Sequence, residues 1–196
     1  MPPRRLLPLI APMIAVALLP AAPAFAHPGH GDGTFAAGLL HPLTGLDHVL
    51  AMLAVGLMAA RRGGKAMLAW PAAFVLSMLA GYALGRVSPG LSADPAIIAS
   101  VIVLGAATVS AKQAPLGLGL ALIAACGLTH GYAHGSEAPG GSSALFPAGF
   151  ALSTLALHAA GLGFGMAAMN TRKPWMIRAA GAGVVLGGLI LAVAGQ

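Results

Sequence analysis

The chain has 196 residues, of which 58% are hydrophobic and only 7% are charged, whereas a soluble domain has roughly 25% charged residues. This composition excludes a water-soluble globule, and the 10 basic and 4 acidic residues among long apolar runs also exclude a disordered tail or a nucleic-acid binder. The single cysteine excludes an internal disulfide framework, and the net charge of +6 is explained by membrane topology rather than by anionic partners.

The start of the chain has the three parts of a secretory signal peptide. Two arginines provide the charged end, residues 6–19 form the apolar stretch, and the Ala-Phe-Ala at 24–26 is a small-residue cleavage site. We therefore predict a cleaved signal peptide at 1–26 and a membrane domain at 27–196. The alternative is that the segment stays attached as a first helix.

Downstream, apolar stretches separated by charges, prolines or glycine clusters predict an all-α, polytopic membrane protein with six transmembrane helices. A helix needs about 20 mostly apolar residues to cross a bilayer, and the third stretch is the shortest. The expected spans are 36–60, 66–85, 96–111, 115–134, 145–169 and 176–195. Close helix packing is expected at the small residues Gly56, Gly81, Gly85, Gly161, Gly163 and Gly165.

Basic residues predict which loops face the cytoplasm. Seven of the eight Lys and Arg residues beyond the signal peptide lie at the junctions after spans one, three and five. The positive-inside rule makes these junctions cytoplasmic. We therefore predict a protein of the bacterial inner membrane whose mature N- and C-termini both face outward, into the periplasm; an uncleaved signal would give the same orientation.

The first predicted span contains an H-x5-D-H motif formed by His41, Asp47 and His48. An ionised carboxylate inside a span costs about 2.5–3.5 kcal/mol, so Asp47 needs a cation or a donor nearby. On one continuous helix, residues seven positions apart share a face, which would align His41 with His48. Gly45 lies between them and has no side chain to block this stripe.

A second motif lies at the outward end of the fourth span, and a single histidine, His158, lies in the fifth. If the fourth helix persists far enough, His130, His134 and Glu137 share one face at positions i, i+4 and i+7. Counting the helical rise from the basic boundaries places the imidazoles of three spans at a similar depth. The alternative for a single membrane histidine is a helix-to-helix hydrogen bond.

Imidazole and carboxylate together suit divalent nickel, cobalt, copper or zinc. The predicted new N-terminus adds His27 and His30, which together with the free α-amine could capture an ion outside the membrane; the alternative is a solvated, flexible terminus. Cys126 and Met52 are expected to be packing residues, and Tyr132 is the aromatic residue that could line the site. A phosphate-binding loop is absent from the sequence, so the chain does not hydrolyse ATP by itself.

The two motifs, from His41-Pro42 to Met52 and from His130 to Glu137, resemble those of the HupE/UreJ family of nickel permeases. The resemblance covers nearly the whole chain, and it implies that His41, Asp47, His48, His130, His134 and Glu137 are the functional residues. It also implies an indirect link to hydrogenase or urease, the nickel enzymes that the family accompanies. Thr129 is a departure, because the family commonly has Phe before the first histidine of the second motif.

The sequence thus predicts an inner-membrane permease for Ni²⁺ that is not an enzyme and has no prosthetic group; the ligand preferences do not separate Ni²⁺ from Co²⁺. The ion is expected to lose part of its water shell to the Asp and His residues of the two motifs, with His158 as a further member. One alternative is an intramembrane zinc hydrolase with the same His/Asp set. Another is an accessory protein that delivers metal without transporting it. The sequence leaves the oligomeric state open.

Overall fold

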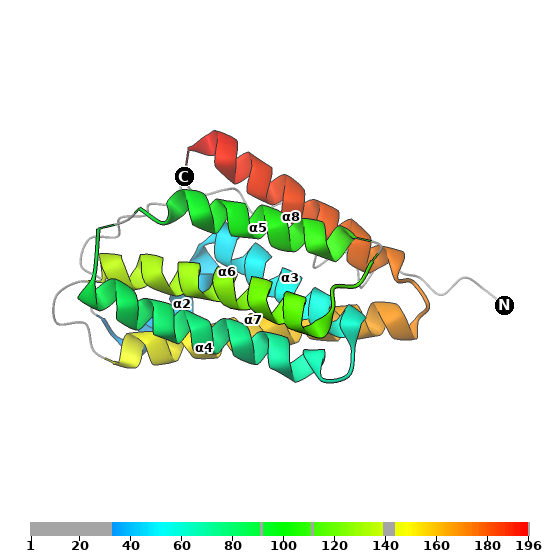
Figure 1. Cartoon of the computed structure of the whole chain (residues 1–196), viewed down its shortest axis with the longest axis horizontal. Helices are drawn as coiled ribbons and strands as arrows, with labels where there is room; N and C mark the ends of the chain where they lie inside the picture. Colours follow the sequence, from blue (N-terminus) through cyan, green and yellow to red (C-terminus); the bar gives the residue numbers. More distant parts are fainter. Residues whose placement is uncertain (1–32, 91, 111, 139–143, 196) are drawn as a thin grey trace.

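The computed structural model describes residues 33–90, 92–110, 112–138 and 144–195, and within these ranges it contains seven helices and no strand. Figure 1 shows them packed side by side as one elongated bundle, with α5 and α8 together along one side. The predicted signal peptide, His27 and His30 lie outside the described residues. The helices are α2 (Phe35–Thr44), α3 (Leu46–Arg62), α4 (Ala66–Val87), α5 (Asp94–Val109), α6 (Leu116–Glu137), α7 (Leu145–Asn170) and α8 (Trp175–Ala194).

The all-α prediction is confirmed for the described residues, and four of the predicted spans coincide with helices long and apolar enough to cross a membrane: α4, α6, α7 and α8. Large apolar side chains also lie on the outside of the bundle, as on Leu68 (80% exposed) and Val193 (89% exposed). A helix rises about 1.5 Å per residue, so the 16 residues of α5 reach about 24 Å, which is less than the roughly 30 Å of a hydrocarbon core.

The prediction of one continuous helix at 36–60 is wrong. The chain breaks at Gly45, and α2 and α3 meet there with a bend of 83°. Pro42 has no N–H to donate to the preceding turn, and glycine has the weakest helix propensity after proline. Gly45 is extended, with φ −95° and ψ 118°. The alignment of His41 and His48 on one helical stripe is therefore also wrong, because the two residues belong to different helices.

Glycines set the spacing of three helix pairs, as expected for membrane helices. A Cβ atom added at Gly131 of α6 would overlap the backbone carbonyl of Met78 in α4, and one added at Gly161 of α7 would overlap that of Leu53 in α3. The packing role predicted for the glycines is confirmed at five of the six positions. It is wrong for Gly163, where an added Cβ would meet no atom of the described residues within 4 Å.

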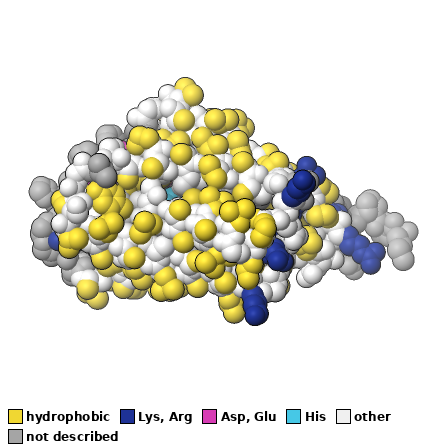
Figure 2. Space-filling model, in the orientation of Figure 1, with side chains coloured by type: hydrophobic (Ala, Val, Ile, Leu, Met, Phe, Trp, Pro, Cys, Tyr) yellow, Lys and Arg dark blue, Asp and Glu magenta, His cyan; other side chains and the backbone are white. Residues whose placement is uncertain are grey.

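Basic side chains gather at one end of the bundle, visible at the right of the face in Figure 2. There Arg61 donates hydrogen bonds to the carbonyls of Thr108 and Ser110, and Arg178 donates one to Val109, 3.1 Å away. The last carbonyls of a helix have no partner within the helix and carry partial negative charge. The two arginines therefore satisfy the C-terminal end of the short helix α5.

Candidate metal centre

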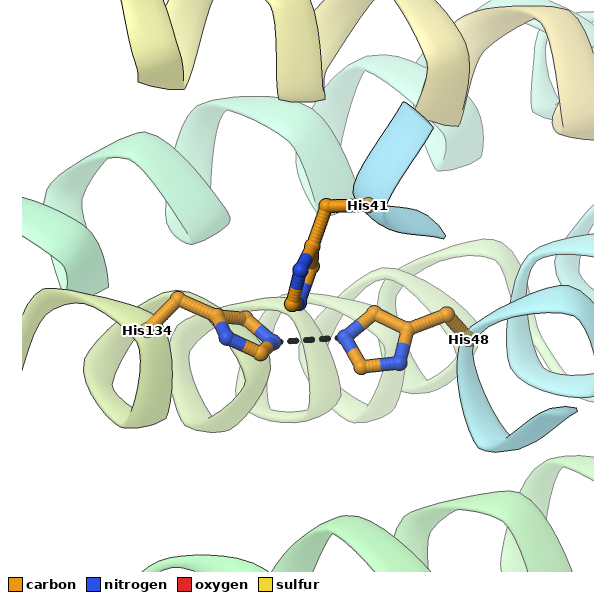
Figure 3. A group of neighbouring side chains, drawn as sticks. All are labelled: His41, His48 and His134. Atoms are coloured by element: carbon orange, nitrogen blue, oxygen red, sulfur yellow. Dashed lines mark hydrogen bonds between the residues drawn. The ribbon is translucent and has the colours of Figure 1, made fainter. Parts of the chain in front are cut away.

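Three histidines from three helices meet near the end of the bundle that lies away from the basic cluster. The ring nitrogens of His41 (α2), His48 (α3) and His134 (α6) offer one ligand atom each, and these atoms lie within 4.8 Å of one another. Figure 3 shows His48 and His134 facing each other, with the ring of His41 pointing toward the gap between them. We call these residues the three-histidine group.

The bend at Gly45 makes this meeting possible. It turns α2 away from the axis of α3, so that His41 and His48 approach each other with ring centroids 5.4 Å apart. His134 joins these two histidines because α6 remains helical to Glu137. The fourth predicted helix therefore persists far enough for the second motif to lie on it. His134 lies in its last turn, and its ring centroid is 4.5 Å from that of His41.

The closest contact in the group joins the two Nε2 atoms of His48 and His134, which are 2.5 Å apart. One nitrogen of such a pair must donate a proton to the other. A metal–imidazole bond is about 2.0–2.1 Å long, so two nitrogens on one ion at a right angle lie about 3 Å apart. If the two rings moved slightly apart, an ion could therefore take the place of the shared proton.

Asp47 supports this arrangement from behind His48. Its Oδ1 lies 2.8 Å from Nδ1 of His48, and since Nδ1 has no aligned hydrogen bond within the described ranges, the contact is an electrostatic one. A carboxylate on the far nitrogen fixes the orientation of a ligating imidazole and raises its basicity. Asp47 thus places a negative charge beside His48, whose Nε2 faces the group.

Three imidazoles form an incomplete shell for a divalent ion. Imidazole suits Zn, Cu, Fe and Ni, and a site with three protein ligands keeps positions open for water. His48 is buried, whereas His41 and His134 are half-buried. The arrangement can bind an ion that exchanges, rather than enclosing one permanently.

The structure does not bring all predicted site residues into the three-histidine group. His130 is fully buried beside it, with its ring centroid 5.4 Å from that of His48. Glu137 is exposed at the end of α6, and His158 is buried in α7. Neither of these two residues belongs to the group.

The imidazole of His130 is oriented by its own helix. Nδ1 lies 2.9 Å from the backbone carbonyl of Cys126, and because a carbonyl only accepts hydrogen bonds, Nδ1 carries the proton. Nε2 then carries a lone pair, and this atom has no hydrogen-bond partner in the part of the chain that the structure describes. His130 therefore presents a free ligand atom one helical turn below His134.

Aromatic side chains are the site neighbours that the motifs do not reveal. The ring of Phe150 in α7 lies 5.1–5.8 Å from all three rings of the group. Tyr132 instead donates a hydrogen bond to the carbonyl of Ser88 and packs in a separate cluster, so it does not line the group. Cys126 and Met52 lie in the main hydrophobic core, as expected. Phe150 had no signal in the sequence beyond its place in an apolar span.

Replacement of Asp47 by Asn is expected to weaken Co²⁺ binding by roughly 10–100-fold, the usual effect of losing an outer carboxylate partner. The amide keeps the shape of the side chain but removes the charge that supports His48. Titration of the purified protein with Co²⁺, followed by visible absorption, measures the change. Asp94→Asn is the matched control, because Asp94 is exposed at the start of α5. Equal affinities for the two variants would contradict the role of Asp47.

The fold and the three-histidine group define a class of protein: a helical membrane protein with a candidate site for a transition-metal ion. Comparison with known sequences makes this specific. The sequence model described as HupE / UreJ protein matches residues 14–191. "Protein HupE" of Rhizobium leguminosarum bv. viciae is 41% identical over 175 residues, which cover 87% of this chain and 90% of that protein. The chain belongs to the HupE/UreJ family. No solved structure matches it.

Family membership also decides between two classes of function. Proteins of the HupE/UreJ family are transporters or accessory factors and not enzymes. The prediction that the chain is not an enzyme is therefore confirmed, and the alternative of an intramembrane zinc hydrolase is not favoured.

Proposed function

We propose that the chain is an inner-membrane permease for divalent nickel that supplies nickel enzymes such as hydrogenase or urease. One observation carries the proposal: three histidines from α2, α3 and α6 converge with their ligand atoms within 4.8 Å. Membership of the HupE/UreJ family supports a role related to nickel or cobalt transport. The ion is the cargo of the protein and not a resident cofactor.

The ligand chemistry sets the expected selectivity. Ca²⁺ and Mg²⁺ prefer oxygen ligands, whereas three imidazoles favour first-row transition metals. Co²⁺ shares the preferences of Ni²⁺, so it is expected to compete. An ion that must also leave is better served by this open shell than by a closed cage.

The proposed path begins outside the membrane. His27 and His30 at the mature N-terminus meet the hydrated ion, and the exposed carboxylate of Glu137 adds negative charge at the rim. His41 follows, and His48, His134 and His130 then replace part of the water shell, with Asp47 offsetting charge behind them. N-terminal sequencing of protein purified from membranes tests the proposed start at His27.

The packing directions of the helices support six crossings. Helices α4 and α6 run parallel, α3 and α7 run parallel, and α5 and α8 run antiparallel. Six successive crossings that begin with α3 require these directions, because helices an even number of crossings apart point the same way. With the basic end in the cytoplasm, the proposed orientation places the three-histidine group and both mature termini on the periplasmic side.

The purified protein, reconstituted into liposomes that contain a metal-sensitive dye, is expected to admit Ni²⁺ and Co²⁺ at least about tenfold faster than Mg²⁺, since the imidazole ligands favour transition metals. Protein-free liposomes are the control. An influx that equals that of the control would overturn the permease proposal. If loss of the gene then impaired maturation of a nickel enzyme while leaving cellular nickel uptake normal, the delivery role would replace it.

A further inference from the structure

We infer that the chain is an inverted structural repeat, with α3–α4–α5 repeated as α6–α7–α8, and that its central axis carries a second, inner ion site built on His158. This inference rests on the proposed transport function and adds a second binding site for the same ion. It begins from the pairing of helices. Exchanging α3 with α6 and α4 with α7 converts the α4–α6 pair into the α7–α3 pair, and both pairs are extensive and parallel.

The glycine contacts have the same register in both pairs. Gly131 of α6 lies against the carbonyl of Met78, and Gly56 of α3 lies against the carbonyl of His158. A shift of 75 residues relates Gly56 to Gly131, and a shift of 80 relates Met78 to His158. The same two shifts convert the contact between Gly81 and Leu128 into the contact between Gly161 and Leu53. They also convert the contact between Gly85 and Tyr132 into the contact between Gly165 and Leu57.

The third helix pair completes the symmetry. Gly105 of α5 lies against Val185 of α8, and Gly188 of α8 lies against Ile102 of α5. A shift of 83 residues relates Gly105 to Gly188 and also Ile102 to Val185. The symmetry therefore converts this antiparallel pair into itself. A two-fold axis perpendicular to the helices makes each helix point the opposite way, so an antiparallel pair that lies on the axis must be converted into itself. Such inverted repeats are common among secondary transporters, which bind their cargo near the midplane where the repeats meet.

The axis passes between α4 and α7, and four buried side chains surround it. The ring of Phe74 lies 5.1 Å from that of His158, and the hydroxyl of Thr154 donates a hydrogen bond to the sulfur of Met78, 3.7 Å away. The shift of 80 residues converts Phe74 into Thr154 and Met78 into His158, so it exchanges one contact with the other. We call these four residues the axial cluster.

The axial cluster contains a histidine without any hydrogen bond to the described residues. His158 is 1% exposed, and both of its ring nitrogens are unpartnered there. Burial of such groups is unfavourable, and a histidine that serves only to join helices would bond across them. The Met78 sulfur belongs to the same cluster, and imidazole and thioether are both ligands of transition metals.

The two proposed sites lie at different depths, with Phe74 between their nearest histidines. His158 is eight residues beyond Phe150 on α7, about 12 Å of helix, and Phe150 marks the level of the three-histidine group. The ring of Phe74 contacts both His130, at 5.5 Å, and His158, at 5.1 Å. An ion passing from the free Nε2 of His130 to His158 must displace the Phe74 ring.

Binding stoichiometry separates the inner site from the outer one. Equilibrium dialysis of the purified full chain is expected to give two Co²⁺ per wild-type molecule and one per molecule for His158→Leu, with the remaining affinity within about twofold of the outer site. Uptake by the same variant in liposomes should fall at least tenfold. Ser153→Ala, a buried change one residue from Thr154 on the same helix, should match wild type in both assays.

Two ions bound to His158→Leu, or unchanged uptake by it, would overturn the inner site. Met78→Leu keeps the side-chain volume and is expected to weaken the inner site alone, which covers the case that the histidine variant fails to fold. Wild-type protein that binds two ions but transports none would overturn the permease proposal and leave the inner site standing. Equal transport rates for wild type and His158→Leu would overturn the inner site and leave the permease proposal standing.

Discussion

Cells that carry the His48→Ala variant are expected to take up nickel at the background rate, with at least about a 100-fold loss of ion affinity. The loss of an outer partner alone costs roughly 10–100-fold, and this variant removes a ligand itself. His48 is the most buried member of the three-histidine group. It also joins the group to Asp47 and to the neighbouring ring of His130.

Uptake of radioactive nickel by cells that express equal amounts of each protein measures this effect. Ser100→Ala is the control, because Ser100 is also buried and polar but its hydroxyl donates a hydrogen bond to the Ile97 carbonyl of its own helix. Uptake by His48→Ala within twofold of that by the control would show that the three-histidine group does not handle the transported ion.

Replacement of Gly131 by Ala is expected to destabilise the folded bundle by about 3 kcal/mol or more, at the upper end of the cost of overpacking. The added Cβ would overlap the carbonyl oxygen of Met78, a backbone atom that cannot turn away. The helices α4 and α6 would have to separate along a seam that also contains Gly127 and Gly135. Thermal unfolding in detergent, followed by circular dichroism, measures the loss.

Gly163→Ala is the matched control for this steric effect. Both substitutions replace helical glycine by alanine, which by itself stabilises a helix by up to about 1 kcal/mol. At Gly163 the new methyl group would meet none of the described atoms within 4 Å, so the melting temperature should stay the same or rise slightly. Equal melting temperatures for the two variants would contradict the packing argument.

The sequence contains enough information to place the helices, because apolar length and the residues that interrupt it are properties of the chain itself. Helices α4, α6, α7 and α8 follow the predicted spans within a few residues. The bend at Gly45 also has a local signal in Pro42 and Gly45, but a glycine between two histidines is equally compatible with an unobstructed face on one continuous helix. A proline three residues before a glycine favours a break.

The composition of the three-histidine group could be predicted only in part. The two motifs contain all three of its members, but membership depends on how α6 lies against α2 and α3, which is a long-range property. The sequence therefore could not separate His134, which joins the group, from Glu137, which does not. Gly161 and Gly163 show the same limit, since they differ only in the face of α7 that they occupy.

The inverted repeat was not visible in the sequence for a related reason. The two halves share backbone paths and glycine positions, but their side chains differ at the centre. His158 corresponds to Met78, and Thr154 corresponds to Phe74. The equivalent places thus hold different side chains, although the helices that carry them pack in the same register.

The three-histidine group also has a consequence for the order of events during synthesis. His48 and His134 are 86 positions apart in the chain, and α4 and α5 are made between them. A growing chain that has not yet inserted α6 has two histidines at the bend but no third one to meet them. The three-histidine group is therefore completed only after about two-thirds of the chain has been made, so a nascent chain without α6 cannot hold an ion with all three histidines.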